Sequence, residues 1–172
     1  AILAIKDFHK EVLLHTYHQS FKKTITNFFK SLQQSKAQTL ILDLRDNQGG
    51  DLEYGAHLLR YLLDTTFTVV QGYKVLAEEE QRLKEVKGPC TGLMRPYKQV
   101  FKGTLIVLIN GGSFSNSGIV SACLRRYGRA YFIGEETGGN NTTLAGYIKT
   151  IRLPNTKMEV QIPTRQFILN NG

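Results

Sequence analysis

Cysteine is scarce in this chain. Its two cysteines, Cys90 and Cys123, do not form a C-x-x-C pair. The sequence therefore lacks the spacing of zinc sites and of dithiol redox centres, and we expect neither a metal nor a cofactor. Cys123 follows the apolar positions of an expected helix, which predicts a place in the core. Whether the two thiols form a disulfide is left open by the sequence.

Long hydrophobic runs are also missing. No run approaches the roughly 20 apolar residues of a membrane-spanning helix, and no signal peptide is visible. The 172 residues suit one domain, 1–172, with a real core. The first residues, AILAIKDF, have the pattern of a strand already in progress. We therefore expect a fragment of a longer protein, which leaves room for a targeting segment.

A concentrated basic patch is absent although the formal net charge is +8. The lysines and arginines are dispersed, and there is no basic arm and no aromatic signature of RNA binding. We therefore expect a solvated basic surface and no nucleic-acid partner.

Apolar periodicity gives the organisation of the chain. Continuous apolar runs, TLILDL and TLIVLI, are typical of strands buried on both faces, and spacings of three and four residues indicate helices. Strand–loop–helix units recur, which predicts an α/β domain with a largely parallel sheet, closed by strands at the end. The expected strands are 2–6, 39–44, 104–109 and 130–133, and the expected helices are 20–35, about 52–63 and one that ends near Arg126. The face of the first helix is expected to comprise Phe21, Ile25, Phe28 and Leu32.

The middle of the chain is less regular. TFTVVQGYKVL (66–76) predicts a strand, the polar EEEQRLKEVK (78–87) is compatible with an exposed helix, and GPCTGLMRPYKQ (88–99) is typical of a loop. Residues 77–102 are the expected insertion or flap. Near the end, 157–162 alternate in the way of a half-buried strand.

The segment NGGSFSNSGIVSACL contains the first candidate for chemistry. A buried strand leads into a glycine turn and then a helix, which would display Ser115 at the carboxyl edge of the sheet, where α/β proteins bind ligands. The amide of Asn116 would lie at the helix N-terminus, where an oxyanion is favoured. The simpler interpretation is that Ser115 or Ser117 only caps the helix. The segment is not G-x-S-x-G, so the nucleophile elbow of the α/β-hydrolases does not apply.

The segment LILDLRDNQGGD is the second candidate. Paired glycines, Gly49 and Gly50, let backbone amides approach a ligand closely and supply a second oxyanion donor. The simpler interpretation is a connecting turn, with Asp43 and Arg45 as a local ion pair. The segment is neither a Walker loop nor a dinucleotide fingerprint. A third glycine loop, GEETGGNNT (134–142), should return beside the first two.

Together, in this order, the three segments resemble the S41 peptidases, the tail-specific or C-terminal processing proteases, a family that includes the tricorn core protease. The resemblance covers roughly residues 38–140. It implies a ClpP/crotonase-like β-β-α spiral core and a serine endopeptidase that acts on polypeptides through an acyl-enzyme. The family's nucleophile is the middle serine of an S-x-S-x-S segment, which is Ser115 here. The implied oxyanion donors are the amides of Asn116 and of Gly49 or Gly50, and bacterial relatives imply a periplasmic or cell-envelope location.

Two departures from the family pattern matter. The Ser/Lys branch carries a lysine where this chain has Asn140, and an asparagine cannot act as a general base. The chain is therefore closer to the tricorn-type branch, whose histidine and acidic residue lie before and after the region covered here. Gly118 stands where many relatives carry Glu. His57 is expected to be an ordinary helix-surface histidine.

Three hypotheses follow. The first is a serine endopeptidase core with its base outside these residues, so that the isolated fragment is nearly inactive. The second is a non-catalytic S41-like module that binds a peptide or an apolar ligand. The third is a crotonase-like acyl-CoA enzyme. Such enzymes share the fold class but lack the serine segment. The sequence does not indicate the substrate preference or the oligomeric state.

Overall fold

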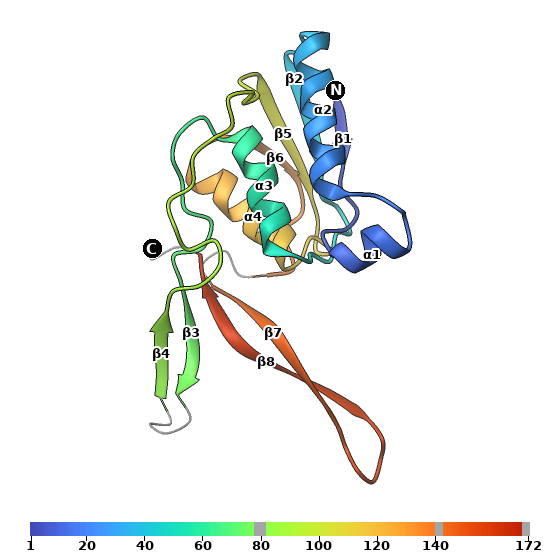
Figure 1. The fold of residues 1–172 in the computed structure, drawn as a ribbon, viewed down its shortest axis with the longest axis vertical. Helices are drawn as coiled ribbons and strands as arrows, with labels where there is room; N and C mark the ends of the chain where they lie inside the picture. The colour runs from blue at the N-terminus through green and yellow to red at the C-terminus, as the bar shows by residue number, and fades with distance from the viewer. Residues whose placement is uncertain (78–81, 140–142, 170–172) are drawn as a thin grey trace.

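The computed structural model describes residues 1–77, 82–139 and 143–169, and Figure 1 shows its arrangement. The helices are α1 (Lys10–His15), α2 (Phe21–Ser35), α3 (Leu52–Leu62) and α4 (Asn116–Arg126). The strands are β1 (Ile2–Ala4), β2 (Thr39–Asp43), β3 (Gly72–Ala77), β4 (Arg82–Val86), β5 (Thr104–Ile109), β6 (Tyr131–Gly134), β7 (Thr143–Arg152) and β8 (Glu159–Ile168).

A four-stranded parallel sheet in the order β1-β2-β5-β6 forms the body of the molecule. Apolar runs predicted two of these strands, β2 and β5, and both are central strands of the sheet. The expected burial on both faces is only partly met, because one face of each strand is mainly buried and the apolar residues of the other face are half-buried. Parallel strands bring their carboxyl ends to one edge. The loops that follow β2, β5 and β6 therefore gather at that edge, where the predicted site residues are found.

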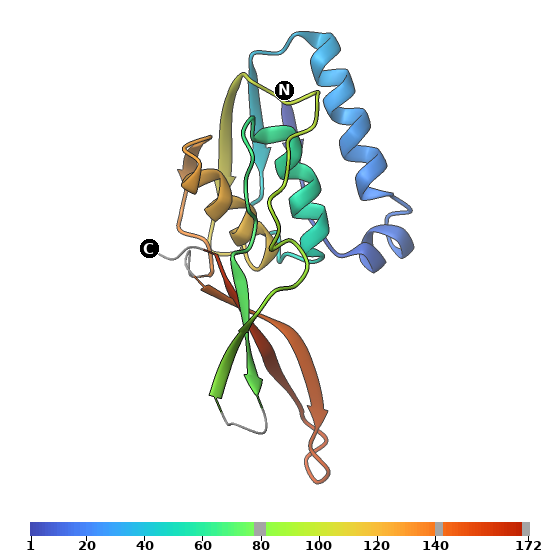
Figure 2. The ribbon, with the colours of Figure 1, turned by 60° about the vertical axis from the view of Figure 1, so that its left-hand side comes forward.

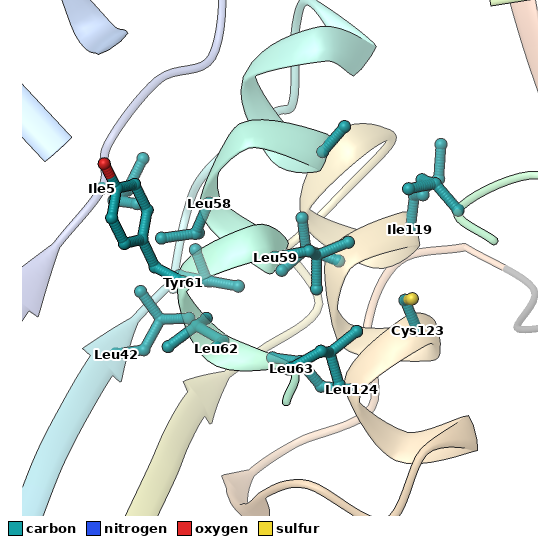
Figure 3. Close-up of a cluster of buried hydrophobic side chains, with 14 of the residues drawn as sticks. Ile5, Leu42, Leu58, Leu59, Tyr61, Leu62, Leu63, Ile119, Cys123 and Leu124 are labelled. Carbon is teal, nitrogen blue, oxygen red and sulfur yellow. The ribbon is translucent and has the colours of Figure 1, made fainter. Parts of the chain in front are cut away.

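The helices cover one face of this sheet. Leu42 of β2 points toward them, and leucines of α3 fill the space between the sheet and α4, with Leu58 and Leu59 fully buried (Figure 3). Aromatic rings join α2 to α3, since Phe29 stacks on Tyr61 at 4.5 Å between ring centroids. Cys123 lies in this core, as expected, and both cysteines are free thiols.

The opposite face of the parallel sheet is largely uncovered. Its side chains form two cross-strand rows, in which the outermost apolar residues are the most exposed: Ile2 at 68%, Tyr131 at 72% and Ile133 at 57%. Parallel sheets are usually buried on both faces, so this face departs from the general pattern. The rows are Ile2–Ile41–Ile106–Tyr131 and Ala4–Asp43–Leu108–Ile133.

A second, antiparallel sheet has the order β4-β3-β8-β7. Figures 1 and 2 show β7 and β8 as a long twisted hairpin that extends away from the body, beside the β3–β4 pair. The predicted α/β class with a parallel sheet is confirmed, but the terminal strands form this separate antiparallel sheet and do not close the parallel one.

Three local predictions were wrong. The helix considered for 78–87 is excluded at Arg82–Val86, which pairs with β3 as a strand; residues 78–81 are outside the described part. The strand predicted at 157–162 begins at Glu159, and its residues up to 162 are exposed on both faces, because the hairpin extends away from the core. In α2, Phe29 and not Phe28 is fully buried.

The division into one domain, 1–172, with 77–102 as an insertion or flap stays a prediction. The predicted loop at 88–99 contains no helix or strand, but Met94 bridges to Phe67. No helix within the described ranges is long and apolar enough to cross a membrane.

Candidate active site

Three loops meet at the carboxyl edge of the parallel sheet. One follows β2 and carries Gly49 and Gly50; another joins β5 to α4 and carries Ser115. The third follows β6, and its Gly138 amide donates to the carbonyl of Ser113 over 3.1 Å. The expected convergence of the three glycine segments is therefore seen for the described residues. Asn140, which the resemblance set at the lysine position of the Ser/Lys branch, lies outside them.

Asn47 holds the first two loops together. Its side chain is fully buried, donates to the Ile5 carbonyl over 2.7 Å and accepts the Gly49 amide over 2.8 Å. Its own carbonyl accepts the Phe114 amide over 2.9 Å and the Ser117 hydroxyl over 2.8 Å. One residue thus fixes the glycine loop and the serine loop relative to each other.

Asp46 and Asn110 add a reciprocal pair between the same loops. The Asp46 amide donates to Asn110 Oδ1 over 3.0 Å, and Asn110 Nδ2 donates to Asp46 Oδ1 over 2.9 Å. These two bonds link the loop after β2 to the loop after β5 a second time.

The three serines of the Ser113–Ser117 segment have different roles in the structure. Ser113 is fully buried, and its hydroxyl donates to the Leu44 carbonyl over 2.8 Å and accepts the Asn110 amide over 3.1 Å. Ser117 is also fully buried and is bound to Asn47. Ser115 is half-exposed, and its hydroxyl has no hydrogen bond to any other described residue. Among the three, the Ser115 hydroxyl alone is free to react.

The backbone of Ser115 is strained. It is the N-cap of α4, with φ 51° and ψ −116°, and its side chain makes no capping hydrogen bond. A non-glycine residue at positive φ costs about 1–3 kcal/mol and is concentrated at functional sites. The simpler interpretation, a serine that serves as a helix cap, does not describe Ser115, because the capping bond is missing.

Gly49 lies directly against the serine. A Cβ atom on Gly49 would be 2.5 Å from Ser115 Cβ and 2.7 Å from the Asn116 amide nitrogen, and its φ is +98°. Only glycine fits such a position. The structure thus brings Gly49, Ser115 and Asn116 together.

The two glycine amides are not equivalent. The Gly49 amide already donates to Asn47 Oδ1, whereas the Gly50 amide has no acceptor among the described residues. Gly50 bridges to Phe8 in parallel register, and α4 begins at Asn116, whose amide is likewise without an acceptor in the described part. Gly50 and Asn116 therefore carry the free amides, and the oxyanion role of Gly49, Gly50 and Asn116 stays a prediction.

The Asn116 side chain is buried beneath the site. It is 1% exposed, and its Nδ2 donates to the Asp51 carbonyl over 2.6 Å. Its Oδ1 lies against Gly55 and has no donor in the described part of the chain.

A cleft of about 490 Å³ lies between α4 and the loop after β6. Gly118, Ala122 and Arg125 line it along one face of α4, and Ser115 precedes Gly118 by three residues on the same face. A Cβ on Gly118 would make only an ordinary 3.6 Å contact with Leu144. The glycine at this position therefore leaves room in the cleft beside Ser115.

Asp43 and Arg45 form the ion pair that the sequence suggested. Arg45 donates to both carboxylate oxygens of Asp43 at 2.9 Å. This hydrogen bonding, with the charge of Lys6, lowers the pKa of Asp43 to about 2. Asp43 therefore stays ionised and is occupied by a structural partner.

His57 is not an ordinary surface histidine. It is half-buried on α3, with its Nδ1 2.9 Å from the Tyr97 hydroxyl. Burial lowers its pKa, a hydrogen bond to the Lys22 backbone opposes this, and the charges of Lys22 and Arg60 lower the pKa further. No hydrogen bond joins it to Ser115, and among the described residues no group of three His, Cys, Asp or Glu side chains could hold a metal ion.

Sequence reasoning missed the organising role of Asn47 and Asn110 and the buried roles of Ser113 and Ser117. The signal was present, because asparagine and serine at strand ends readily bond to nearby backbone. The sequence does not show which of three serines turns inward.

Two solved structures share this fold. The fold matches mature CPAF with a TM-score of 0.79 at 14% identity, covering 99% of this chain and 43% of that one. It matches the photosystem II D1 C-terminal processing protease with a TM-score of 0.60 at 18% identity, covering 98% and 37%.

The sequence is 30% identical over 131 residues to the tail-specific protease of Haemophilus influenzae, which covers 76% of this chain and 17% of the relative. It is 30% identical over 134 residues to the carboxy-terminal processing protease CtpA of Bacillus subtilis, covering 77% and 26%. The chain thus spans about a quarter or less of these relatives. Residues 1–172 match Peptidase family S41, and the chain belongs to that family.

Proposed function

We propose that this chain is the catalytic core of a serine endopeptidase that hydrolyses polypeptides, with Ser115 as the nucleophile. The observation that carries the proposal is the contrast among the three serines. Ser113 and Ser117 bind backbone carbonyls, whereas Ser115 is half-exposed and unbonded within the described residues. A free hydroxyl in a strained helix-start conformation is poised to attack a carbonyl.

The oxyanion would be bound by two backbone amides. The Asn116 amide lies at the start of an 11-residue helix, where the helix dipole favours negative charge. The Gly50 amide is the second donor, because the Gly49 amide is already bonded to Asn47. Such preorganised donors typically contribute a factor of about 10²–10³ each to kcat.

The general base is proposed to lie outside the described residues. Asn140 occupies the position of the lysine in the Ser/Lys branch, and no lysine lies between residues 130 and 148. The arrangement favours the tricorn-type branch, in which a histidine and an acidic residue come from other parts of a longer polypeptide. The isolated 172-residue chain would then have little activity.

The cleft beside α4 is the proposed site for a substrate side chain. Gly118 and Ala122 form a narrow apolar floor, and Glu135 and Glu136 lie on the opposite wall. The names of the relatives, C-terminal processing and tail-specific proteases, favour a polypeptide substrate. A periplasmic or cell-envelope location is an expectation from bacterial relatives, and other relatives are named chloroplastic.

A second candidate is a non-catalytic module that binds a peptide in the same cleft. The observation that favours it is that the Ser115 hydroxyl has no base bonded to it among the described residues. In this case the peptide would bind and remain intact.

Cleavage of an unstructured protein such as casein by the longer polypeptide separates the two candidates. The peptidase proposal expects turnover that Ser115→Ala removes while peptide binding persists. Binding without turnover in the unmodified protein would support the second candidate, and turnover retained by Ser115→Ala would refute the role of Ser115.

A further inference from the structure

A second cleft, of about 680 Å³, lies on the other side of α3 from the serine helix. Its floor is one face of α3, formed by Glu53, Ala56, His57 and Arg60 at helical spacing. Lys22 of α2 and the loop 89–97 form its walls. None of the residues of the proposed catalytic apparatus lines it.

The charges in this cleft are predominantly positive. Lys22, Arg60 and Arg95 line it with a single acid, Glu53, which lies 3.7 Å from Lys22 and is largely exposed. With His57 neutral, the lining carries an excess of two positive charges.

Arg60 has no anionic partner among the described residues. Its half-buried guanidinium donates to neutral acceptors only, the Arg95 carbonyl over 2.8 Å and the Tyr97 hydroxyl over 3.1 Å, and it stacks 3.8 Å above the Tyr97 ring. No carboxylate lies within 4.0 Å of it in the part of the chain that the structure describes. A partly buried charge usually has a counter-charge, and the Tyr97 ring holds this planar group in place.

His57 is affected by the same positive charges. Its neighbours are Tyr97 and Tyr61 at its ring, the Thr26 hydroxyl, and the charges of Lys22 and Arg60. Burial and these two cations disfavour a proton on the imidazole and lower its pKa. An anion bound between the cations would oppose this effect.

The remaining wall of the cleft is apolar. Pro89, Cys90 and Met94 line it, and Leu93 is 71% exposed at its rim. A large apolar side chain beside an unpartnered guanidinium suits a ligand with a charged end and an aliphatic end.

We propose that this cleft binds a small carboxylate that carries an aliphatic group. Arg60 and Lys22 hold the carboxylate, with Arg60 able to present its fork of donors, and the Leu93–Met94 wall holds the aliphatic group. Such chemistry is shared by a free fatty acid and by the apolar carboxyl-terminal residue of a peptide. The site is independent of Ser115 and does not rest on the peptidase proposal.

Titration of the 172-residue chain with N-acetyl-leucine, followed by calorimetry and by the NMR signals of His57, tests the proposal. We expect a dissociation constant of roughly 1 mM and an upward shift of the His57 pKa on binding. N-acetyl-leucinamide keeps the aliphatic group but lacks the charge, and it should bind at least about tenfold more weakly. Octanoate serves as the fatty-acid probe, and whichever acid binds more tightly identifies the source.

The variant Lys22→Gln should weaken binding about fivefold or more, and Arg60→Gln should weaken it further. Lys23→Gln, a neighbouring exposed lysine that does not line the cleft, is the matched control and should bind as the unmodified chain does. If Arg60→Gln fails to fold, Lys22→Gln still decides the result. Equal binding of the acid and the amide, unchanged affinity in Lys22→Gln, or no binding of either acid at 20-fold the expected dissociation constant would overturn the proposal.

Discussion

Alanine at each serine of the Ser113–Ser117 segment should give three different free energies of unfolding. Ser113→Ala removes a buried hydroxyl that donates to the Leu44 carbonyl and accepts the Asn110 amide. The Leu44 carbonyl keeps the Asn47 amide at 3.3 Å, but the Asn110 amide is left without its acceptor. Because an unsatisfied buried group costs about 1–3 kcal/mol, we expect a loss of about 2 kcal/mol.

Ser117→Ala should cost less. Its hydroxyl donates to the Asn47 carbonyl, which keeps a second donor, the Phe114 amide at 2.9 Å. The expected loss is about 1 kcal/mol, that of a single hydrogen bond. Ser115→Ala removes a half-exposed hydroxyl with no described partner, so the change should stay within about 0.5 kcal/mol.

Urea unfolding of the 172-residue chain, followed by far-UV circular dichroism, measures these differences. With a slope of about 1–3 kcal/mol per molar urea, a loss of 2 kcal/mol is readily resolved in the midpoint. The order Ser113, Ser117, Ser115 is the expected result. A loss for Ser115→Ala as large as that for Ser113→Ala would show that the Ser115 hydroxyl is structural, and the reasoning that singles it out as a nucleophile would fail.

Other substitutions test the remaining contacts. Gly49→Ala should destabilise the chain by at least about 2 kcal/mol, since the new Cβ would lie 2.5 Å from Ser115 Cβ, whereas Gly111→Ala, with nothing within 4 Å, should be tolerated; equal midpoints in urea would contradict this packing. The contribution of Asp43 to the free energy of unfolding should be fully present above about pH 4 and be lost toward pH 2, because the pKa of Asp43 is lowered from 3.8 to about 2 in the folded state. The variant Asp43→Asn should be less stable at pH 6, and its stability should depend less on pH. Identical pH profiles for the two proteins would refute the role of the pair with Arg45. Leu42→Ala should cost about 2–5 kcal/mol because Leu42 is fully buried beneath the helices, whereas Ile133→Ala on the uncovered face should cost less than about 1 kcal/mol; comparable thermal midpoints would show that this face is covered in solution.

Local apolar patterns in the sequence predicted much of the fold. The runs at β2 and β5 and the spacing in α2 and α3 identified those elements, because apolar residues in a continuous run or on one helical stripe leave a direct mark on the sequence. The same reasoning failed at β4, and at the start of β8 it predicted the strand but not its full exposure. Both segments lie in the antiparallel sheet, where pairing with a neighbouring strand decides the conformation and little side-chain burial accompanies it.

The sequence predicted which residues of the candidate site lie together, and their chemical roles stay predictions. Gly49, Ser115 and Asn116 meet as the order of motifs implied. The sequence did not show that the Gly49 amide is bonded and the Gly50 amide is not, because this difference depends on which amide the Asn47 side chain accepts. The half-buried position of His57 was missed in the same way, because its contact with Tyr97 joins residues that are far apart in the sequence.

The most direct test of the central claim is the site of covalent modification by a fluorophosphonate. The protein, together with any residues that flank this chain, is treated with the reagent, and the labelled peptide is identified by mass spectrometry. A single adduct on Ser115, absent in Ser115→Ala, is the predicted result. An adduct on another residue, or labelling that survives Ser115→Ala in a folded protein, would contradict the account.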